Sequence, residues 1–474
     1  MPSTRRDFLR HAACALGSAA LASSVDSFHL INALTPQAAT DYRALVCVFL
    51  NGGNDGNNMV VSLDQYNGPA GSATVGYSNV RGASGLAIPQ ASLLPVSPAN
   101  GGGSYGLHPN MPEMQARFNE GRLAVLCNVG PLVEPLTRAT YQNGTGKRPL
   151  QLFSHSDQIG LFQTAIANSV SQTGWGGRVA DLTAALNGAA SFPQNVSIAG
   201  LNLFLSGVDT RQLAIGDSNT ALSNVLPLTM TGTTAERTSR RASFDELRGL
   251  DNNLKLVRAA SDIRSSALQT SAALASVSPA LNTLFPNTSL GRQLLQIARV
   301  IKASTDPSAG INMKRQVFFA QLGGFDTHSN QRTTGQDALM LQLSQALNAF
   351  YNATVELGVQ NNVTAFTLSD FGRTLSPAGT GAAVGSDHAW GSHHLVIGGA
   401  VNGQRFYGTY PTLALGGPDD TDGGSTPRGR WIPTTSVEQY AATLANWYGL
   451  STSDFPAVFP LINRFPTTNL GFML

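Results

Sequence analysis

The chain has 474 residues, and its 30 Lys and Arg residues nearly balance its 28 Asp and Glu residues, which leaves a formal net charge of +2 at pH 7. A chain of this length can bury one large core or two domains. Its arginines are dispersed, so the charge pattern gives no electrostatic case for a nucleic-acid partner. Only 12% of the residues are charged and 49 are glycine, which favours a loop-rich protein outside the cytoplasm.

The N-terminus carries the pattern of an export signal. Arg5 and Arg6 precede a weakly apolar run of small residues, 11–22. A paired arginine before such a run is typical of signals that bind the twin-arginine export machinery. We therefore expect residues 1–33 to be a signal peptide and the mature protein to be periplasmic or extracellular. The run is too short to span a membrane, and no later stretch is apolar for long enough, so we expect no membrane span in the mature chain.

The first predicted strand is the continuous apolar run 43–50. Such a run suits a strand that is buried on both faces, as in a parallel sheet. It ends in the glycine-rich segment 51–58, which contains Asn54 and Asp55. Glycines there would let the backbone approach a ligand closely. Asn and Asp could instead satisfy their own backbone in a tight turn, and this segment alone does not decide between the two interpretations.

A second buried strand is predicted over 123–129, and Cys127 within it is expected to be a buried strand residue without a disulfide partner. Farther along, Ser154 and His155 begin a helix that we predict to extend to residue 167. Backbone amides at the start of a helix favour an anion. Taken alone, however, the simpler interpretation is that Ser154 caps the helix.

The segment 234–305 differs in composition from the rest of the chain. It holds much of the charge and has repeated helical spacing of apolar residues, interrupted at Pro279 and Pro286. Proline ends or kinks a helix, so two or three helices are expected. We interpret this segment as a helical layer that covers the sheet and carries no chemistry of its own.

The densest chemistry follows two further predicted strands. The run 316–322 leads into Asp326 and His328, and the run 363–368 leads into Asp370 and Arg373. The loop beyond adds four polar residues: Asp387, His388, His393 and His394. A strand that ends in a carboxylate, followed by a loop with Asp and His, is typical of a metal or oxyanion site. The alternative is a polar surface loop with hydrogen-bonded histidines.

Predicted strands and helices alternate, with an amphipathic helix over 337–357, a last strand over 395–401 and a closing helix over 436–448. This order favours an α/β fold with a mostly parallel sheet, in which ligands bind at the carboxyl ends of the strands. Asp55, Asp326 and Asp370 each follow a strand, so we expect them at one edge of the sheet.

Asp together with neutral His suits Zn²⁺ or Mn²⁺, with Ca²⁺ as a further option, and the site could hold one or two divalent metal ions. Arg373 could bind a phosphate or sulfate group as a fork, or form a structural pair with a nearby Asp. His393 and His394 would point to opposite faces of a strand, and we favour His393 for the site.

The motifs resemble one known family. They are Gly-Gly-Asn-Asp-Gly at 52–56, Gly-Gly-Phe-Asp-Thr-His-Ser-Asn-Gln at 323–331, Ser-Asp-Phe-Gly-Arg-Thr at 369–374 and Ser-Asp-His-Ala-Trp-Gly at 386–391. Together with the Ser-His pair, they are similar to the exported bacterial family called domain of unknown function 1501, which is grouped with sulfatase-like proteins of the alkaline phosphatase superfamily. The resemblance implies an alkaline-phosphatase-like three-layer sandwich over 41–474, with helices on both faces of the central sheet.

The resemblance also implies site residues. Asp55 matches the metal-binding Asp after the first strand, Asp326 and His328 match a later metal-binding pair, and Asp370 matches a strand-end Asp. His388 or His393 would be the last histidine. The chain departs from the phosphatase pattern at Phe371, where many phosphatases have His, and no Asp-Ser-Ala signature surrounds the Ser-His pair.

The leading hypothesis is an exported metal-dependent hydrolase of phosphate or sulfate esters, acting on a small molecule or a glycan. Ser154 would attack, with His155, Asn54 and Arg373 at the oxyanion and His393 near the substrate. The expected metal ligands are Asp55, Asp326, His328, Asp370, Asp387 and His388. The alternative is a non-catalytic binding protein on the same fold in the cell envelope. A serine hydrolase is a weaker alternative, because no Gly-x-Ser-x-Gly elbow surrounds Ser154.

Overall fold

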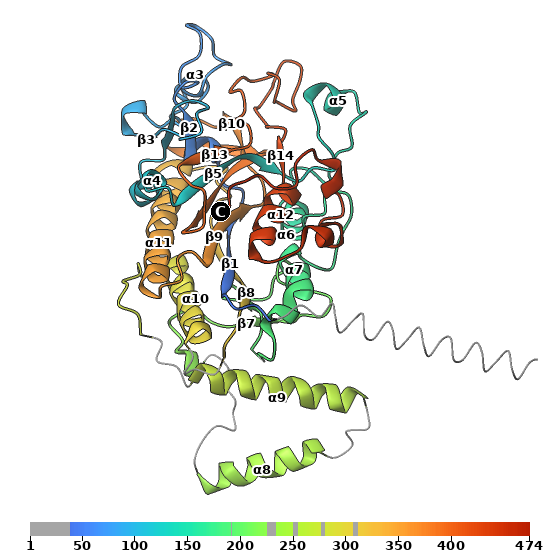
Figure 1. Cartoon of the computed structure of the whole chain (residues 1–474). Helices are drawn as coiled ribbons and strands as arrows, with labels where there is room; N and C mark the ends of the chain where they lie inside the picture. Colours follow the sequence, from blue (N-terminus) through green and yellow to red (C-terminus); the bar gives the residue numbers. More distant parts are fainter. Residues whose placement is uncertain (1–37, 191, 225–233, 250–254, 276–279, 307–310) are drawn as a thin grey trace, which may run out of the picture.

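A computed structural model describes residues 38–474, except 191, 225–233, 250–254, 276–279 and 307–310 (Figure 1). The predicted export signal, 1–33, lies outside the described residues. Within them, a central sheet is covered by helices on both faces. None of the helices in this part of the chain combines the length and apolar character needed to cross a membrane.

The central sheet has nine strands in the order β13-β5-β12-β9-β1-β8-β6-β7, and β14 pairs with β5. Neighbouring strands are parallel except at β12, which is antiparallel to both β5 and β9. The predicted mostly parallel sheet is therefore confirmed, although the last of its long strands runs in the opposite direction. The strands are β1 Arg43–Asn51, β5 Leu123–Gly130, β6 Asn195–Ser197, β7 Gln212–Ala214, β8 Arg315–Gly323, β9 Val363–Ser369, β12 Ser392–Gly398, β13 Arg405–Tyr407 and β14 Thr435–Ser436.

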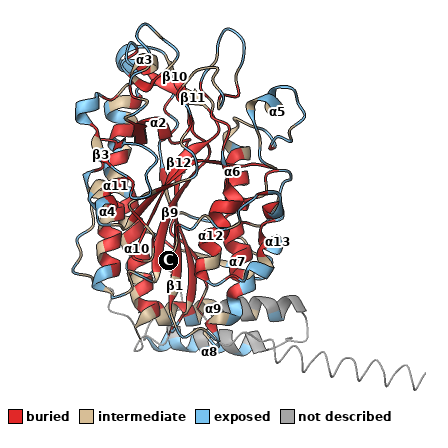
Figure 2. Cartoon of the chain, turned by 45° about the horizontal axis from the view of Figure 1, so that its top comes forward, coloured by how far each residue is buried: buried red, intermediate tan, exposed pale blue. Residues whose placement is uncertain are grey.

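Strand β1 is buried on both faces, as its uninterrupted apolar sequence predicts. Its side chains alternate between two cores: Val46 and Val48 belong to one, and Cys47 and Phe49 to the other. A strand with helices on both sides must be apolar at every position, and this is why β1 shows no polar alternation. Figure 2 shows the sheet buried between the two layers of helices. Cys47 and Cys127 are both buried and unpaired.

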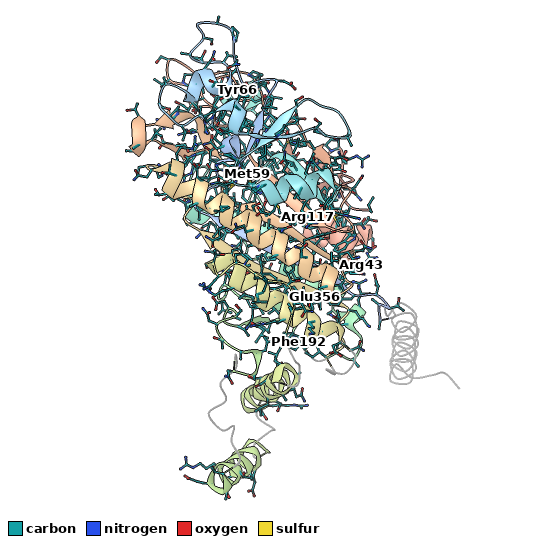
Figure 3. All side chains as sticks on the ribbon, turned by 90° about the vertical axis from the view of Figure 1, so that its left-hand side faces the viewer. Arg43, Met59, Tyr66, Arg117, Phe192 and Glu356 are labelled. Carbon is teal, nitrogen blue, oxygen red and sulfur yellow. The ribbon has the colours of Figure 1, made fainter. Side chains whose placement is uncertain are left out.

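In the described part of the chain, helices cover both faces of the sheet. Figure 3 shows the first layer side-on, with Arg117 and Glu356 labelled. Arg117 ties that layer together by donating to Asn348 at 2.9 Å and to Asn352 at 3.0 Å. The first layer is α4 Pro112–Asn119, α10 Ser289–Thr305 and α11 Gln336–Glu356, and the second is α6 His155–Thr164, α7 Trp175–Thr183, α12 Val437–Tyr448 and α13 Phe455–Val458.

Smaller elements lie around these layers. Ser436 and Gln439 form a capping box at the start of α12, the closing helix that the sequence predicts. The segment 234–305 contains α10 and two further helices, α8 and α9. Strand β6 is only three residues long. The remaining elements are α2 Gly56–Met59, α3 Tyr77–Arg81, α5 Arg138–Gln142, α8 Ala235–Gly249, α9 Lys255–Ala275, the three-stranded sheet β2 Val60–Ser62, β3 Leu94–Val96 and β4 Tyr105–Leu107, and the hairpin β10 Arg373–Ala378 with β11 Gly385–His388.

Candidate metal centre

Three neighbouring parallel strands end at one edge of the sheet. In the register of β1 with its neighbours, Asn51 pairs with Gly323 of β8 and Leu50 pairs with Ser369 of β9. The residues that follow these strands therefore emerge side by side, as the rule for parallel sheets predicts. The start of α6 and the end of β11 reach the same edge, so that segments distant in the sequence meet there.

Three imidazoles gather around one carboxylate oxygen at this edge. Asp326 Oδ1 lies 3.4 Å from His155 Nε2, 3.2 Å from His328 Nε2 and 3.8 Å from His388 Nε2. The Nε2 atoms of His328 and His388 are 2.9 Å apart. We call Asp326, His155, His328 and His388 the histidine cluster. His328, His388 and Asp326 were expected as ligands, whereas His155 was expected at an oxyanion.

The other nitrogen of each ring is already occupied. Nδ1 of His155 lies 2.7 Å from Asp370 Oδ2, and Nδ1 of His328 lies 3.0 Å from Asp387 Oδ1. Nδ1 of His388 lies 2.8 Å from the carbonyl oxygen of Phe153. A carbonyl oxygen and a carboxylate can only accept, so each Nδ1 donates. In a neutral ring the proton is then on Nδ1, and Nε2 presents a lone pair.

Lone pairs that converge in this way repel one another unless a proton or a cation lies between them. The Nε2 atom of His155 is buried and has no hydrogen-bond partner. Ligand atoms about 2.0 Å from a tetrahedral zinc ion are about 3.3 Å apart. The distances of 3.2–3.8 Å from Asp326 Oδ1 to the three Nε2 atoms are close to this value. Metal-binding histidines almost always donate their other ring N–H to a carboxylate, a carbonyl or water, and these three imidazoles donate Nδ1–H to a carboxylate or a carbonyl. The residues therefore fit a divalent ion.

The donor set narrows the choice of ion. Three imidazole nitrogens and one carboxylate oxygen suit Zn²⁺ or Mn²⁺, whereas Ca²⁺ takes oxygen ligands almost exclusively. The Ca²⁺ option is thus not supported. Among the described residues, His155, Asp326 and His388 form the only group of three or more potential ligands whose ligand atoms all lie within 4.8 Å of one another, and His328 is outside that group. This favours one ion over two.

The electrostatics of the histidine cluster differ from ring to ring. The hydrogen bond from His155 to Asp370 raises the pKa of that imidazole, against the effect of burial. Burial lowers the pKa of His388. Burial alone would raise the pKa of Asp326, but its hydrogen bond to Arg373, together with nearby positive charge, brings the pKa below its ordinary value. An ion would compete with protons for these rings, so its affinity must rise with pH.

Asp370 and Asp387, both expected as metal ligands, stand behind the imidazoles. The side chain of Asp370 is fully buried, and besides His155 it accepts from the backbone N–H of Gly52 at 3.0 and 3.2 Å. Asp387 supports His328 and lies 3.6 Å from Nη1 of Arg428. The strand-end rule thus places Asp370 at the expected edge, whereas Asp387 comes from the loop segment, and each of the two carboxylates accepts from an imidazole Nδ1.

Arg373 forms the structural pair with an Asp that was one of its two expected roles. Its buried guanidinium donates to Asp326 Oδ1 at 2.6 Å, to Ser386 O at 2.9 Å and to Gly53 O at 2.9 Å, and it also contacts Gly52 O. These hydrogen bonds occupy the Arg373 guanidinium, which therefore cannot also bind a substrate anion. The expected role of Arg373 in substrate binding is thereby corrected.

Asp55, expected among the ligands, lies in a separate buried ion pair. Its carboxylate receives two hydrogen bonds from Arg81, at 2.6 and 3.2 Å. It receives three more, from Gln331 at 2.6 Å and from the backbone N and side-chain Nδ2 of Asn57 at 3.0 and 3.1 Å. A carboxylate with five donors has no lone pair left for a metal. The Arg81 guanidinium thus neutralises the Asp55 carboxylate, whose charge a second metal ion would otherwise neutralise.

Three further expectations are not met by the side-chain contacts. Asn54 is buried, and its amide contacts Gln336 and Met59, so it cannot reach an oxyanion. Ser154 is the N-cap residue of α6, but its Oγ bonds to Asp157 at 2.6 Å and makes no capping bond. His393 is buried away from any substrate: its Nδ1 accepts from Asn128 N, and burial lowers its pKa to about 4.

Sequence reasoning missed three partners of this site. Arg81 comes from a segment that looks like a loop, and no local pattern connects it to Asp55. Gln331 and the carbonyl of Phe153 also carried no signal. Phe153 has a positive φ of 71°, a conformation uncommon for a residue other than glycine, and this turn aims its carbonyl at His388. Only the Ser-His pair at a predicted helix start could have indicated the position of His155.

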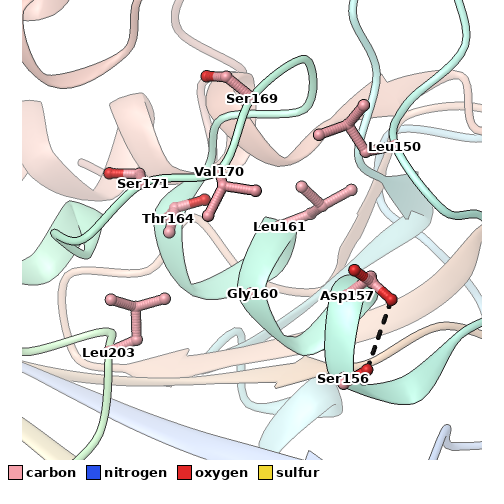
Figure 4. Close-up of a pocket in the computed structure, with 10 residues that line it drawn as sticks. All are labelled: Leu150, Ser156, Asp157, Gly160, Leu161, Thr164, Ser169, Val170, Ser171 and Leu203. Atoms are coloured by element: carbon pink, nitrogen blue, oxygen red, sulfur yellow. Dashed lines mark hydrogen bonds between the residues drawn. The ribbon is translucent and has the colours of Figure 1, made fainter.

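A pocket of about 200 Å³ lies on the outer face of α6 (Figure 4). Its lining includes Asp157, Leu161 and Thr164, and Val170 at its rim is 82% exposed. Helical spacing places these α6 residues on the side of the helix opposite His155. The pocket is therefore not the entrance to the histidine cluster, and nothing in the structure indicates what covers it.

Comparison with known proteins identifies the family of this chain. A family model described as "Protein of unknown function (DUF1501)" matches residues 42–420, which confirms the family predicted from the motifs. No curated protein matches the chain.

Among solved structures, the C-terminal periplasmic domain of EcEptC from Escherichia coli, in complex with Zn, has 10% sequence identity and a TM-score of 0.34, covering 89% of this chain and 88% of that one. The PsFucS1 sulfatase from Pseudoalteromonas sp. has 11% identity and a TM-score of 0.31, with coverages of 91% and 70%. The structure of Ps i-CgsB in complex with k-i-k-neocarrahexaose has 10% identity and a TM-score of 0.32, with coverages of 89% and 77%. At these identities and TM-scores we draw no conclusion about this chain from the similarity.

Proposed function

This chain belongs to the DUF1501 family, and we propose that it is an exported hydrolase of phosphate or sulfate esters that uses one divalent metal ion. The observation that carries the proposal is the convergence of three imidazole Nε2 atoms on Asp326 Oδ1, with every Nδ1 already donating. Export to the periplasm or beyond is part of the proposal and rests on the paired arginine at the N-terminus.

In this proposal His155, His328, His388 and Asp326 hold the ion. When bound, the ion would polarise the ester and lower the pKa of a water molecule. Asp370, Asp387 and the carbonyl of Phe153 keep the rings in the correct tautomer. The side chains of Asp326 and His328 are 53% and 46% exposed, so a substrate can reach the histidine cluster from solvent. A closed structural site would bury them.

An anionic substrate also needs a positive side chain, and Arg373 is already used. The candidate is Arg428, whose side chain is 51% exposed and lies 3.6 Å from the Asp387 carboxylate that supports His328. An arginine with free donors can bind two oxygens of a phosphate or sulfate at once. Arg430 is less suitable, because it donates to the His388 carbonyl and its guanidinium lies 4.4 Å from the centre of the Phe153 ring.

The attacking group in this proposal is water and not Ser154. The Oγ of Ser154 donates to Asp157, and no histidine lies among its hydrogen-bond partners. Activation of a serine requires a base or a metal in direct contact with its hydroxyl. We therefore expect Ser154→Ala to keep most of the hydrolytic activity.

A second candidate is a binding protein that carries the ion but has no turnover. The buried ion pair of Asp55 with Arg81 favours the binding protein. This pair removes one carboxylate from the metal ligands that a two-ion phosphatase mechanism would need. The two candidates differ in one measurable respect: only the hydrolase converts aryl phosphates or aryl sulfates to products.

The test combines metal analysis with an ester panel on the full chain purified without chelator. The hydrolase predicts one zinc or manganese ion per chain and release of phosphate or sulfate. His328→Ala should abolish both, whereas Asp157→Asn, a change on α6 outside the histidine cluster, should keep both. Metal without turnover would favour the binding protein. Protein without metal and without turnover would overturn the proposal.

A further inference from the structure

A pocket of about 370 Å³ lies apart from the histidine cluster and shares no lining residue with it. It forms where β2, β4, β5 and β13 come together with the loops before β4 and after β13. The residues that line it include Asp64, Gln65, Asn100, Tyr105, Thr409 and Tyr410. Its volume falls in the range of small-molecule sites, roughly 300–1,000 Å³.

One side of this pocket is aromatic. The Tyr105 and Phe406 rings stack with centroids 4.1 Å apart, and the Tyr410 ring lies 5.3 Å from that of Tyr105. Both tyrosine hydroxyls are fixed: Tyr105 donates to Gly102 O at 2.7 Å, and Tyr410 donates to Val60 O at 2.8 Å. The pocket thus has a rigid aromatic wall that loses little conformational entropy when it binds a ligand.

Two amide side chains in the lining are held by the backbone. Asn100 donates to Phe406 O at 2.7 Å and accepts from Phe406 N at 3.3 Å. Gln65 donates to Pro411 O at 3.2 Å and accepts from Leu413 N at 2.8 Å. A primary amide has two N–H groups and an oxygen with two lone pairs. Beyond these bonds, each amide retains an N–H and a lone pair for a ligand.

The charge of the pocket excludes some ligands. Among the described residues that line the pocket, Asp64 is the only one with a charged side chain, and its Oδ2 accepts from Ser104 N at 2.8 Å. With a carboxylate and no cation, the pocket disfavours an anion. Cys127 at the pocket is buried, and burial raises the pKa of its thiol, so it stays neutral.

We propose that this pocket binds a neutral carbohydrate. Fixed amides and a carboxylate can pair with the hydroxyl groups of a sugar, while the rigid aromatic side chains offer apolar contact to its ring carbons. A quaternary ammonium group is the other ligand that aromatic rings and a carboxylate can bind. It fits less well, because Tyr105 and Phe406 turn their faces toward each other and not around a cation. The proposal goes beyond the hydrolase and does not depend on it.

The test is ligand binding to the full chain, measured by saturation-transfer NMR and by titration calorimetry. The probes are glucose, galactose, N-acetylglucosamine and choline at millimolar concentrations. We expect at least one sugar to bind. Thr409→Trp, which fills the pocket from its exposed rim, should abolish this binding, and Thr409→Ser should keep it. Asp64→Asn should weaken it about tenfold, the worth of one hydrogen bond to a charged group.

The control is Asp209→Asn, an exposed carboxylate elsewhere on the surface, which should bind as the wild type does. Three results would overturn the proposal: no sugar binds, choline binds and the sugars do not, or binding is unchanged in both Thr409→Trp and Asp64→Asn. Thermal melting shows whether Thr409→Trp folds, and if it does not, Asp64→Asn decides. The binding assay needs neither metal nor turnover, so its result can be interpreted even if the hydrolase proposal fails.

Discussion

Asp370→Asn should weaken metal binding while leaving the shape of the site intact. In the wild type, Asp370 accepts from His155 Nδ1 at 2.7 Å and from Gly52 N at 3.0 and 3.2 Å. Asparagine has only one side-chain oxygen, so it cannot accept hydrogen bonds from both His155 Nδ1 and Gly52 N as well as the carboxylate does. If its NH₂ group faces His155, the imidazole proton must move to Nε2, where the ion would bind.

The size of the effect follows from the bond that is lost. A hydrogen bond to a charged group contributes about 1.5–3 kcal/mol, and each 1.4 kcal/mol is about tenfold in affinity. Changes behind a metal-binding histidine commonly cost about 10–100-fold in affinity. We therefore expect Asp370→Asn to raise the Kd for zinc by about 10–100-fold.

The assay is a competition titration of the metal-free protein against a chromophoric chelator of known affinity. Asp157→Asn is the matched control, because it makes the same chemical change on α6, at a carboxylate whose hydrogen bonds are to Ser154 and Ser156. Its Kd should stay within about twofold of the wild-type value. Equal Kd values for Asp370→Asn and Asp157→Asn would refute the role of Asp370 in orienting His155.

Further predictions concern stability. Arg81→Met should lower the free energy of unfolding in urea by about 3 kcal/mol, because it leaves the buried Asp55 carboxylate without its cation, and an unchanged midpoint would contradict this. Burial raises the pKa of Glu438 to about 8, so the folded protein takes up a proton there and loses stability as pH rises from about 4.5 to about 8. Glu438→Gln should thus raise Tm relative to wild type at about pH 8.5 and much less at about pH 5, and an equal shift at both would count against the buried carboxyl. Removing the metal with EDTA should lower Tm, and restoring zinc should recover it, because an ion that binds only the folded chain stabilises it.

The buried strands were predictable because their signal is local. Strand β1 contains a continuous apolar run, β8 and β9 are mostly apolar, and the alternation of strands with helices implies parallel neighbours. The reversed direction of β12 was not predictable in this way. Its apolar sequence is compatible with either direction, and the choice depends on its pairing with β5, which lies far away in the sequence.

The placement of the site was predictable, but the roles of its residues were less so. The strand-end rule brings Asp326, Asp370 and Asp55 to one edge, and the structure places them there. The strand-end rule does not say which carboxylate faces an imidazole ring, which faces a guanidinium and which faces the solvent. Those roles depend on Arg81 and Arg373, whose side chains enter the site from elements that sequence periodicity cannot orient.

The most direct test of the metal centre is X-ray absorption at the zinc or manganese edge of the full chain purified without chelator. The histidine cluster predicts a first shell of nitrogen and oxygen at about 2.0–2.2 Å, with the outer-shell scattering of three imidazoles. His155→Ala should remove one of those imidazoles from the spectrum. A metal with oxygen ligands alone, or a spectrum that His155→Ala and His388→Ala leave unchanged, would contradict the account.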